Sequence, residues 1–353
     1  RWSQCSGGCD GSGVQKILVI RTDAGAAIGW GHLMRCLALA QGWQEAGGAV
    51  RFVMAAPAEP FRTRLESEGM EVETLGAEAG SAEDAAATVE RALASQACWV
   101  VLDGYHFPSG YQRVIRKAGL RLMVIDDHGA LQRYYADVVL NQNLNAKENL
   151  YRNRAPRALL LVGTRYALLR REFRRFRGWQ RESPRIARKV LVTLGGGDAG
   201  NVTRKAMQAV EKIGVEGIEA RVVIGASNPH YQQLATAAKR ARTPMRLERD
   251  VSDMAEAMAW ADVAVAAGGS SCWEMLFLQL SGVLVVSVPH QRQVVESLVG
   301  RGLFCSAGWW RQAAAERIAV CLEQRMRDEG ARQRAACQGR LLVDGGGVER
   351  VLA

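Results

Sequence analysis

The sequence predicts an α/β protein made of two Rossmann-type domains, each with a doubly wound parallel sheet. Short runs of β-branched and aliphatic residues alternate with helix-like stretches along most of the chain. Most of these runs are apolar at successive positions, which is typical of parallel strands covered on both faces. The same alternation begins again at Lys189, after a charged segment that lacks such runs. Together these observations predict two successive domains of one class.

Each series of runs defines one predicted sheet. The first series covers residues 16–21, 50–55, 99–103, 122–126, 138–140 and 159–162, with helical segments between the strands. The second series starts with VLVTLGGG after Lys189 and continues at residues 220–227, 246–247, 261–269 and 283–289. From about Gln312 the chain is rich in Ala, Arg, Glu and Gln, which predicts helices interrupted by DGGG at 344–347.

A charged, proline-containing segment separates the two series. REFRRFRGWQRESPR (residues 171–185) has few β-branched residues, as interdomain connections often do. We therefore place the boundary near residue 180, with domains at 14–180 and 181–353 after a Gly/Ser-rich leader (residues 1–13) that we expect to be flexible. Two such domains facing one another enclose a cleft at the carboxyl ends of their strands, where ligands of this architecture bind.

Composition excludes several classes of protein. The chain has 353 residues, of which 48% are hydrophobic and 23% charged, so it is long enough for two globular domains. No apolar run approaches the roughly 20 residues of a membrane-spanning helix, and no secretory signal is recognisable, so we expect a cytoplasmic protein without stable membrane insertion. The net charge of +10 is dispersed; a phosphorylated small molecule suits it as well as nucleic acid does.

The cysteines predict reduced thiols. Five of the eight lie in or beside apolar stretches, as small buried thiols do: Cys36, Cys98, Cys272, Cys305 and Cys321. Cys5 and Cys9 have no second Cys or His pair at a matching spacing. His106, His128 and His230 also lack such spacing, and we expect chemistry without a metal or another cofactor.

The strongest local signal is RTDAGAAIGWGHLMRCLALA, which begins at Arg21 and joins a strand to a helix through a glycine-rich turn. Gly29 and Gly31 allow the backbone to approach a ligand, and the amino end of the following helix offers N–H groups to phosphate. His32 stands in the first helical turn, where the helix dipole favours the neutral imidazole and hence a proton acceptor. The alternative is a structural histidine held by hydrogen bonds.

Three charged residues of the same segment are further candidates for substrate binding. Asp23, at the end of the strand, either orients His32 or binds a sugar hydroxyl. Arg35, one turn along the helix, either pairs with a carboxylate or reaches phosphate. We include Arg21, at the start of the motif, in the same candidate site.

Two glycine-rich turns of the second half suit a nucleotide. In VTLGGGDAGNVTRK, Gly195 and Gly196 follow a strand, and Asn201 is the expected cap of the next helix. The segment is not a Walker motif, so these glycines either line a nucleotide or serve chain packing.

The second of these turns, AVAAGGSSCWE, brings two hydroxyls and several N–H groups together where a diphosphate would fit: Gly268, Gly269, Ser270 and Ser271. Glu274 either completes a capping box with Ser271 or binds the ribose hydroxyls.

Four polar residues follow strands at the expected cleft. His290 and Gln291 come after the last predicted strand of the second half, and Asp103 and Tyr105 follow the third strand of the first half. Asp103 and Tyr105 are candidates for reading the sugar, whereas Asp126 and Asp127 equally suit the end of their strand.

In these motifs the chain resembles the UDP-2,4-diacetamido-2,4,6-trideoxy-β-L-altropyranose hydrolases of pseudaminic acid biosynthesis, relatives of the GT-B glycosyltransferases. The likeness extends from Lys16 to Val351 and rests on ordered stretches that include RTDAGAAIGWGHLMRC, VVLDGYHF, RLMVIDDHG, ADVVLNQN, VLVTLGGGDAGNVT, ADVAVAAGGSSCWE, HQRQVVESL and LLVDGGGVERV.

This resemblance implies a GT-B-like fold and hydrolysis of a UDP-linked deoxy-acetamido sugar. His32 would be the general base toward water, and UDP, the leaving group, would lie mainly on the second domain. Tyr105 resembles a sugar-pocket tyrosine, and the GGSS turn with Glu274 resembles the diphosphate and ribose site. Gln291 resembles the second member of an Asn-Gln pair whose first position is His290 here, a change in shape and donors that leaves the sugar open.

Two other functions remain possible from the sequence. A glycosyltransferase on the same scaffold would pass the sugar to a hydroxyl acceptor. A non-catalytic protein that binds nucleotide sugars or nucleic acid would use the net positive charge, but the chain lacks the interleaved aromatic and basic residues of such surfaces. The oligomeric state is left open.

Overall fold

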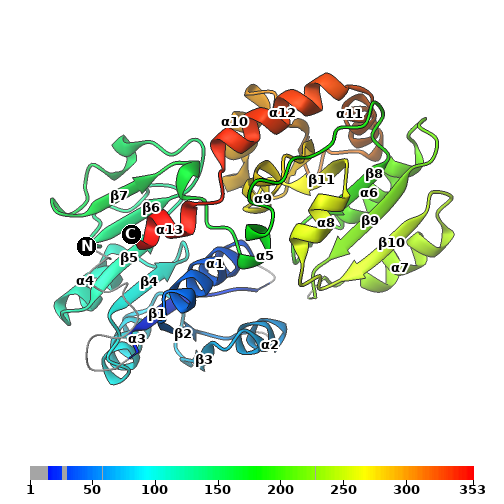
Figure 1. Cartoon of the computed structure of the whole chain (residues 1–353). Helices are drawn as coiled ribbons and strands as arrows, with labels where there is room; N and C mark the ends of the chain where they lie inside the picture. Colours follow the sequence, from blue (N-terminus) through cyan, green and yellow to red (C-terminus); the bar gives the residue numbers. More distant parts are fainter. Residues whose placement is uncertain (1–14, 26–29, 58, 227) are drawn as a thin grey trace. The chain divides into compact units, whose positions relative to one another are not determined.

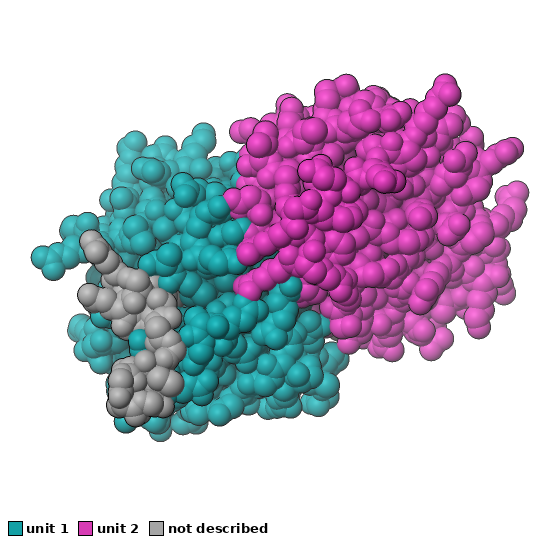
Figure 2. Space-filling model, in the orientation of Figure 1, with its two compact units in different colours: residues 1–28, 32–171, 346–353 teal, residues 29–31, 172–345 magenta. Residues whose placement is uncertain are grey.

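The computed structural model describes residues 15–25, 30–57, 59–226 and 228–353. The predictions for Gly29, for the leader and for Cys5 and Cys9 lie outside these residues. The chain divides into two compact units, which Figure 2 shows in different colours. Unit 1 contains the described residues within 1–28, 32–171 and 346–353, and unit 2 those within 29–31 and 172–345.

Unit 1 is built on a parallel sheet of seven strands in the order β3-β2-β1-β4-β5-β6-β7 (Figure 1). Its strands are β1 (Ile17–Thr22), β2 (Ala49–Met54), β3 (Glu71–Thr74), β4 (Trp99–Asp103), β5 (Arg121–Ile125), β6 (Val138–Asn141) and β7 (Leu159–Val162). Its helices are α1 (Gly31–Glu45), α2 (Glu59–Ser67), α3 (Ala82–Ala94), α4 (Ser109–Lys117) and α13 (Gly347–Leu352), with 3₁₀ turns η2 (Glu148–Tyr151) and η3 (Thr164–Tyr166).

Unit 2 repeats the pattern with six parallel strands in the order β10-β9-β8-β11-β12-β13. Its strands are β8 (Lys189–Thr193), β9 (Glu219–Ile224), β10 (Met245–Arg249), β11 (Val263–Ala267), β12 (Gly282–Val286) and β13 (Cys305–Trp309). Its helical elements are α5 (Arg171–Arg174), α6 (Val202–Glu211), α7 (Tyr231–Arg240), α8 (Met254–Trp260), α9 (Ser271–Phe277), η4 (Pro289–Gln291), α10 (Arg292–Gly300), α11 (Ala315–Arg327) and α12 (Glu329–Leu342).

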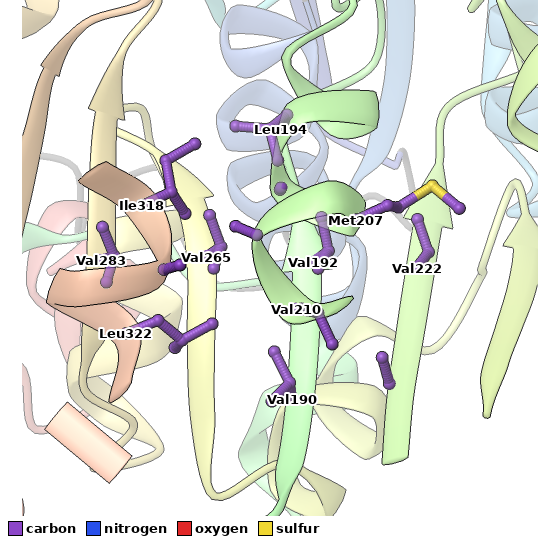
Figure 3. Close-up of a cluster of buried hydrophobic side chains, with 14 of the residues drawn as sticks. Val190, Val192, Leu194, Met207, Val210, Val222, Val265, Val283, Ile318 and Leu322 are labelled. Atoms are coloured by element: carbon purple, nitrogen blue, oxygen red, sulfur yellow. The ribbon is translucent and has the colours of Figure 1, made fainter. Parts of the chain in front are cut away.

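Apolar residues cover both faces of these sheets, as the sequence predicts. In unit 2, α6 and α11 pack on one face of the sheet, and Figure 3 shows Met207, Val210, Ile318 and Leu322 of these helices directed at the strands. The valines that they meet are fully buried: Val190, Val192, Val222, Val265 and Val283. In unit 1, α3 and α4 cover one face through Ala85, Ala92, Tyr111 and Ile115.

Two strands were not predicted, and both lack the apolar pattern on which the prediction rested. β3 has the sequence EVET with exposed ends, as an edge strand often does. β13 has the sequence CSAGW, in which Gly308 adopts a positive φ of 87° and the pairing with β12 shifts register. Short irregular edge strands carry little of the β-branched signal.

The chain passes between the two units at Arg171/Glu172 and returns to unit 1 at Gly346. The predicted boundary lay near residue 180. Residues 172–180, between the observed and the predicted boundary, belong to unit 2. So does the next residue, Arg181, which donates to Leu278 O at 2.9 Å and to Met258 O at 2.7 Å. These carbonyls lie at the carboxyl ends of α9 and α8, so one guanidinium satisfies groups that helices leave without intrahelical partners.

Within the described residues, no helix is both long and apolar enough to cross a bilayer.

Strand order reverses at one place in each sheet. In unit 1 the chain moves outward from β1 through β2 to β3 and then returns to the other side of β1 with β4. In unit 2 the same reversal occurs between β8 and β11. Loops diverge to opposite faces at such a point, and the carboxyl ends of the two strands are left open to side chains and ligands.

Candidate active site

His32 lies where the strand order of unit 1 reverses. It is the second residue of α1, which follows β1, and only 6% of its surface is exposed. Its Nδ1 atom is 2.6 Å from Oδ1 of Asp103, the last residue of β4. Since β1 and β4 are neighbours, this contact follows from the topology.

The contact with Asp103 determines which nitrogen of His32 carries hydrogen. Asp103 is fully buried, and burial alone would raise its pKa, but Arg35 and His32 hold that pKa well below its ordinary value. Nδ1 of His32 also lies 3.1 Å from Nη2 of Arg35, which can only donate. An ionised carboxylate only accepts hydrogen bonds, so the shorter contact with Asp103 assigns the hydrogen to Nδ1 and the contact with Arg35 is then not a hydrogen bond. In the neutral ring Nε2 then presents the lone pair, which is the tautomer that a general base requires.

Arg35 links two carboxylates at the same edge of the sheet. Its Nε and Nη2 atoms donate to the two oxygens of Asp103 at 2.6 and 2.7 Å. Its Nη1 atom lies 2.9 Å from both oxygens of Asp127, which follows β5. Of the two roles considered for Arg35, pairing with carboxylates is the one that the structure shows.

Asp127 connects this group to Tyr105 and Asn143. The Tyr105 hydroxyl donates to Asp127 Oδ2 at 3.0 Å, and Asn143 Nδ2 donates to Oδ1 at 2.7 Å. The Tyr105 ring meets His32 edge to face at a centroid distance of 4.7 Å, while 48% of the tyrosine surface stays exposed. Tyr105 is therefore placed to contact both a bound molecule and the imidazole.

In this region the structure excludes one of the two roles considered for Asp23 and corrects the predictions for Arg21 and Asp103. Asp23 does not orient His32, because its Oδ2 contacts Arg21 at 2.7 Å and His106 at 3.0 Å while its Oδ1 accepts from Ala55 N. Arg21 is fully buried and forms two hydrogen bonds of 2.9 and 2.8 Å with Asp84, so it serves the interior and not a ligand. Asp103, predicted to read the sugar, is also inaccessible and instead holds His32 and Arg35.

Asp127 and Asn143 belong to the site although the sequence did not single them out. Asp127 was interpreted as a possible strand end, a role that Asp126 fills by accepting from the amides of His128 and Gly129. The signal lay in IDD and NQN, which follow β5 and β6 at the edge where Asp103 ends β4.

In unit 2 the turn after β8 differs from the prediction. Asn201 is the residue before α6, but its side chain does not cap the helix. The Asp198 carboxylate instead accepts from Val202 N and Thr203 N, each at 2.8 Å. Gly196 lies against Gly225, since a β-carbon on Gly225 would lie 2.4 Å from the Gly196 Cα atom. Gly195 has a φ of 85°, which favours glycine.

The turns after β11 and β12 bring several predicted residues together. A β-carbon on Gly268 would lie 3.4 Å from Cβ of Gln291, and one on Gly269 would lie 3.6 Å from its Nε2. The Oε1 atom of Gln291 accepts from Ser287 N at 2.9 Å, and the adjacent His290 is exposed.

The predicted capping box is not formed. Helix α9 begins at Ser271, and Ser270 occupies the cap position with φ −59° and ψ −27°, without a capping bond from its side chain. The carboxyl-bearing Glu274 is 9% exposed on the first turn of the helix. The described residues contain no group of three or more His, Cys, Asp or Glu suited to a metal ion.

The chain is distantly similar in sequence to three proteins. It is 22% identical to the UDP-2,4-diacetamido-2,4,6-trideoxy-β-L-altropyranose hydrolase of Campylobacter jejuni over 291 residues, which are 81% of this chain and 97% of the hydrolase. It is 26% identical to the spore coat polysaccharide biosynthesis protein SpsG of Bacillus subtilis over 167 residues, 47% of this chain and 49% of SpsG.

The third relative is the uncharacterized protein MJ1062 of Methanocaldococcus jannaschii, 22% identical over 284 residues, 79% of this chain and 57% of MJ1062. The chain thus spans about half the length of SpsG and MJ1062. No protein-family model matches it.

Solved structures show the fold. Acinetobacter baumannii MurG matches with a TM-score of 0.64 and 14% identity over 95% of this chain and 98% of MurG. A putative UDP-N-acetylglucosamine 2-epimerase from Listeria monocytogenes matches with a TM-score of 0.65 and 14% identity, covering 96% of this chain and 95% of the epimerase. Spinosyn rhamnosyltransferase SpnG matches with a TM-score of 0.64 and 14% identity over 96% of this chain and 100% of SpnG. The chain therefore has a GT-B-like α/β fold, together with distant sequence similarity to a UDP-sugar hydrolase.

Proposed function

We propose that this protein hydrolyses a UDP-linked acetamido-deoxy sugar to UDP and the free sugar. The observation that carries the proposal is the His32–Asp103 pair at the strand-order reversal of unit 1, with a nitrogen-to-oxygen distance of 2.6 Å. The distant similarity to the Campylobacter jejuni hydrolase supports the same reaction. The fold and the similarity together support an enzyme that handles nucleotide sugars. The identity of the sugar is the finer part of the proposal.

In this reaction His32 acts as the general base. Nε2 accepts a proton from water while the water oxygen forms a bond to the anomeric carbon. The bond from that carbon to the diphosphate oxygen breaks, and its electron pair leaves with UDP. Asp103 holds the ring by Nδ1 and stabilises the imidazolium that results, as the carboxylate of a catalytic triad does.

We further propose that unit 2 binds UDP. The Gly268–Gly269 turn, Ser270 and Ser271 offer backbone and hydroxyl donors to the diphosphate, and Glu274 is the candidate for the ribose hydroxyls. Such donors stabilise charge on a departing diphosphate by a few kcal/mol each. Tyr105 is the candidate for the sugar, and His290 the candidate for setting which sugar is accepted.

The test is a screen of UDP-acetamido sugars in the presence of EDTA, with UDP and free sugar quantified by mass spectrometry. We expect equal amounts of both products without any added acceptor. His32→Ala and His32→Gln should lower kcat by roughly 10²- to 10⁴-fold, while both variants retain UDP binding by calorimetry.

A glycosyltransferase is the second candidate, because a His–Asp pair deprotonates an acceptor hydroxyl as readily as water. It predicts that UDP forms only when a hydroxyl acceptor is present. Turnover unchanged by either His32 variant would show that this imidazole is not the base.

A further inference from the structure

Asp127 is the second carboxylate of the site, and the hydrolysis proposed above assigns no role to it. On the basis of that proposed function, we infer that Asp127 is a positioning residue. It holds Arg35 and Tyr105 in place and supplies the negative charge against which His32 accepts a proton.

The contacts of Asp127 show the positioning part of this role. Both carboxylate oxygens lie 2.9 Å from Nη1 of Arg35, and the Tyr105 hydroxyl and Asn143 Nδ2 donate to them at 3.0 and 2.7 Å. Only 13% of the Asp127 side chain is exposed. Asp127 therefore binds Arg35 at Nη1, while Asp103 binds it at Nε and Nη2. Asp103 in turn orients His32.

The charged groups around His32 can be counted element by element. Helix α1 contributes Arg35 and the thiol of Cys36, whose pKa is raised by burial so that it stays neutral. Strand β4 and its loop contribute Asp103 and the neutral phenol of Tyr105. The loop after β5 contributes Asp127, and also His128, whose ring packs against Tyr105 at a centroid distance of 4.8 Å.

Two carboxylates therefore face one guanidinium. With a neutral imidazole the group carries a net charge of −1, and with an imidazolium the charge is zero. Accepting a proton neutralises a cluster whose charged side chains are all nearly buried, where unbalanced charge is costly. Without Asp127 the same step would create a net positive charge.

The experiment compares Asp127→Asn, Arg35→Gln and the double variant, a set that we call the charge cycle because its members differ in the net charge around His32. Asp127→Asn should move the acid limb of the kcat/KM profile to lower pH, and Arg35→Gln should move it to higher pH, each by about one pH unit. The double variant restores a net charge of −1 and should have its limb near that of the unaltered protein. A purely structural role predicts no shifts of opposite sign and no such cancellation.

Two controls complete the cycle. Asp126→Asn removes a carboxylate from the neighbouring position, where the side chain contacts the amides of His128 and Gly129 and the Tyr134 hydroxyl; its acid limb should shift by less than half as much as that of Asp127→Asn. Tyr105→Phe removes a hydrogen bond to Asp127 but keeps the charge, and should leave the limb in place. If Asp127→Asn does not fold, Asp127→Ser takes its place in the cycle, with the same shift of the acid limb to lower pH expected.

A readout that needs no substrate separates this inference from the proposed function. The ¹⁵N signals of the His32 ring are followed against pH in the ligand-free protein and in the three charge-cycle variants. Opposite shifts that cancel in the double variant support the role of Asp127 even if no UDP-sugar is hydrolysed. Hydrolysis that depends on His32, with unshifted titrations in all variants, would overturn it.

Discussion

Asp103→Asn is the most direct test of the pairing on which the candidate site depends. Asp103 accepts from Nδ1 of His32 at 2.6 Å and from Nε and Nη2 of Arg35 at 2.6 and 2.7 Å. Asparagine keeps one acceptor oxygen and replaces the other with an NH₂ donor. Two of the groups that point at this side chain can change from donor to acceptor: the imidazole of His32 and the thiol of Cys36, which lies 3.3 Å from Oδ2. The imidazole nitrogen is the stronger acceptor of the two, and a guanidinium has no acceptor. The substitution therefore favours the tautomer with hydrogen on Nε2.

That tautomer cannot accept a proton from water at Nε2. We expect kcat to fall by about 10³- to 10⁴-fold, the size of effect seen when a triad carboxylate loses its charge, with little change in KM. Loss of a buried charge partner also costs about 3 kcal/mol of unfolding free energy. The assay is steady-state hydrolysis together with urea denaturation and ¹⁵N spectra of the His32 ring.

Asp84→Asn is the matched control. Asp84 is equally buried and bonds Arg21 through both oxygens, so its loss destabilises the same unit without touching His32. We expect a similar loss of unfolding free energy and a nearly unchanged kcat. An Asp103→Asn protein that keeps kcat within threefold of the unaltered enzyme would refute the assignment of Nε2 as the base.

Two further predictions concern stability. Burial lowers the pKa of Arg181 to about 10, and its guanidinium caps the carboxyl ends of α8 and α9. Arg181→Ala should lower the free energy of unfolding, measured by urea denaturation, by about 2 kcal/mol. Arg175→Ala, which breaks an exposed pair with Asp253, should lower it by less than about 1 kcal/mol. Equal losses for the two arginines would contradict the capping role. Partner cations and hydrogen bonds outweigh burial and lower the pKa of four carboxylates in unit 1. Their stabilisation is therefore complete above the unfolded pKa of about 4 and is lost progressively as pH falls from there through the lower folded pKa. These carboxylates are Asp23, Asp84, Asp103 and Asp127. The melting temperature should accordingly fall steeply between about pH 5 and pH 3, and a constant value over this range would contradict the reasoning.

The sheets themselves were largely predictable, because a strand buried on both faces must be apolar at almost every position. The predicted run at residues 99–103 coincides with β4, and the run at 159–162 coincides with β7. The helices after Gln312 and their interruption at DGGG were predicted from composition and are present as α11, α12 and α13. The strands that were not predicted, β3 and β13, lie at the edges of their sheets, where one side is unpaired and the apolar requirement is relaxed.

The composition of the candidate site was less predictable. His32 and Arg35 were identified because a glycine-rich turn before a helix is a local feature. Their carboxylate partners are 68 and 92 positions away from Arg35, and no local pattern distinguishes Asp103, which orients the base, from Asp23, which does not. Arg21 shows the opposite error, since it shares the motif of His32 but points into the interior and pairs with Asp84.

The sequence by itself determined the class of fold, the repeat of one architecture and the loops that carry chemistry, because periodicity and glycine-rich turns act over a few residues. Only the tertiary structure decided which carboxylates pair with His32 and Arg35. The order β3-β2-β1-β4-β5-β6-β7 brings the ends of β1, β4 and β5 to one edge of the sheet, and hydrogen bonds of 2.6–3.0 Å then select Asp103 and Asp127 among the available carboxylates. Strand order is a property of the whole chain, so it lies beyond the reach of local residue patterns.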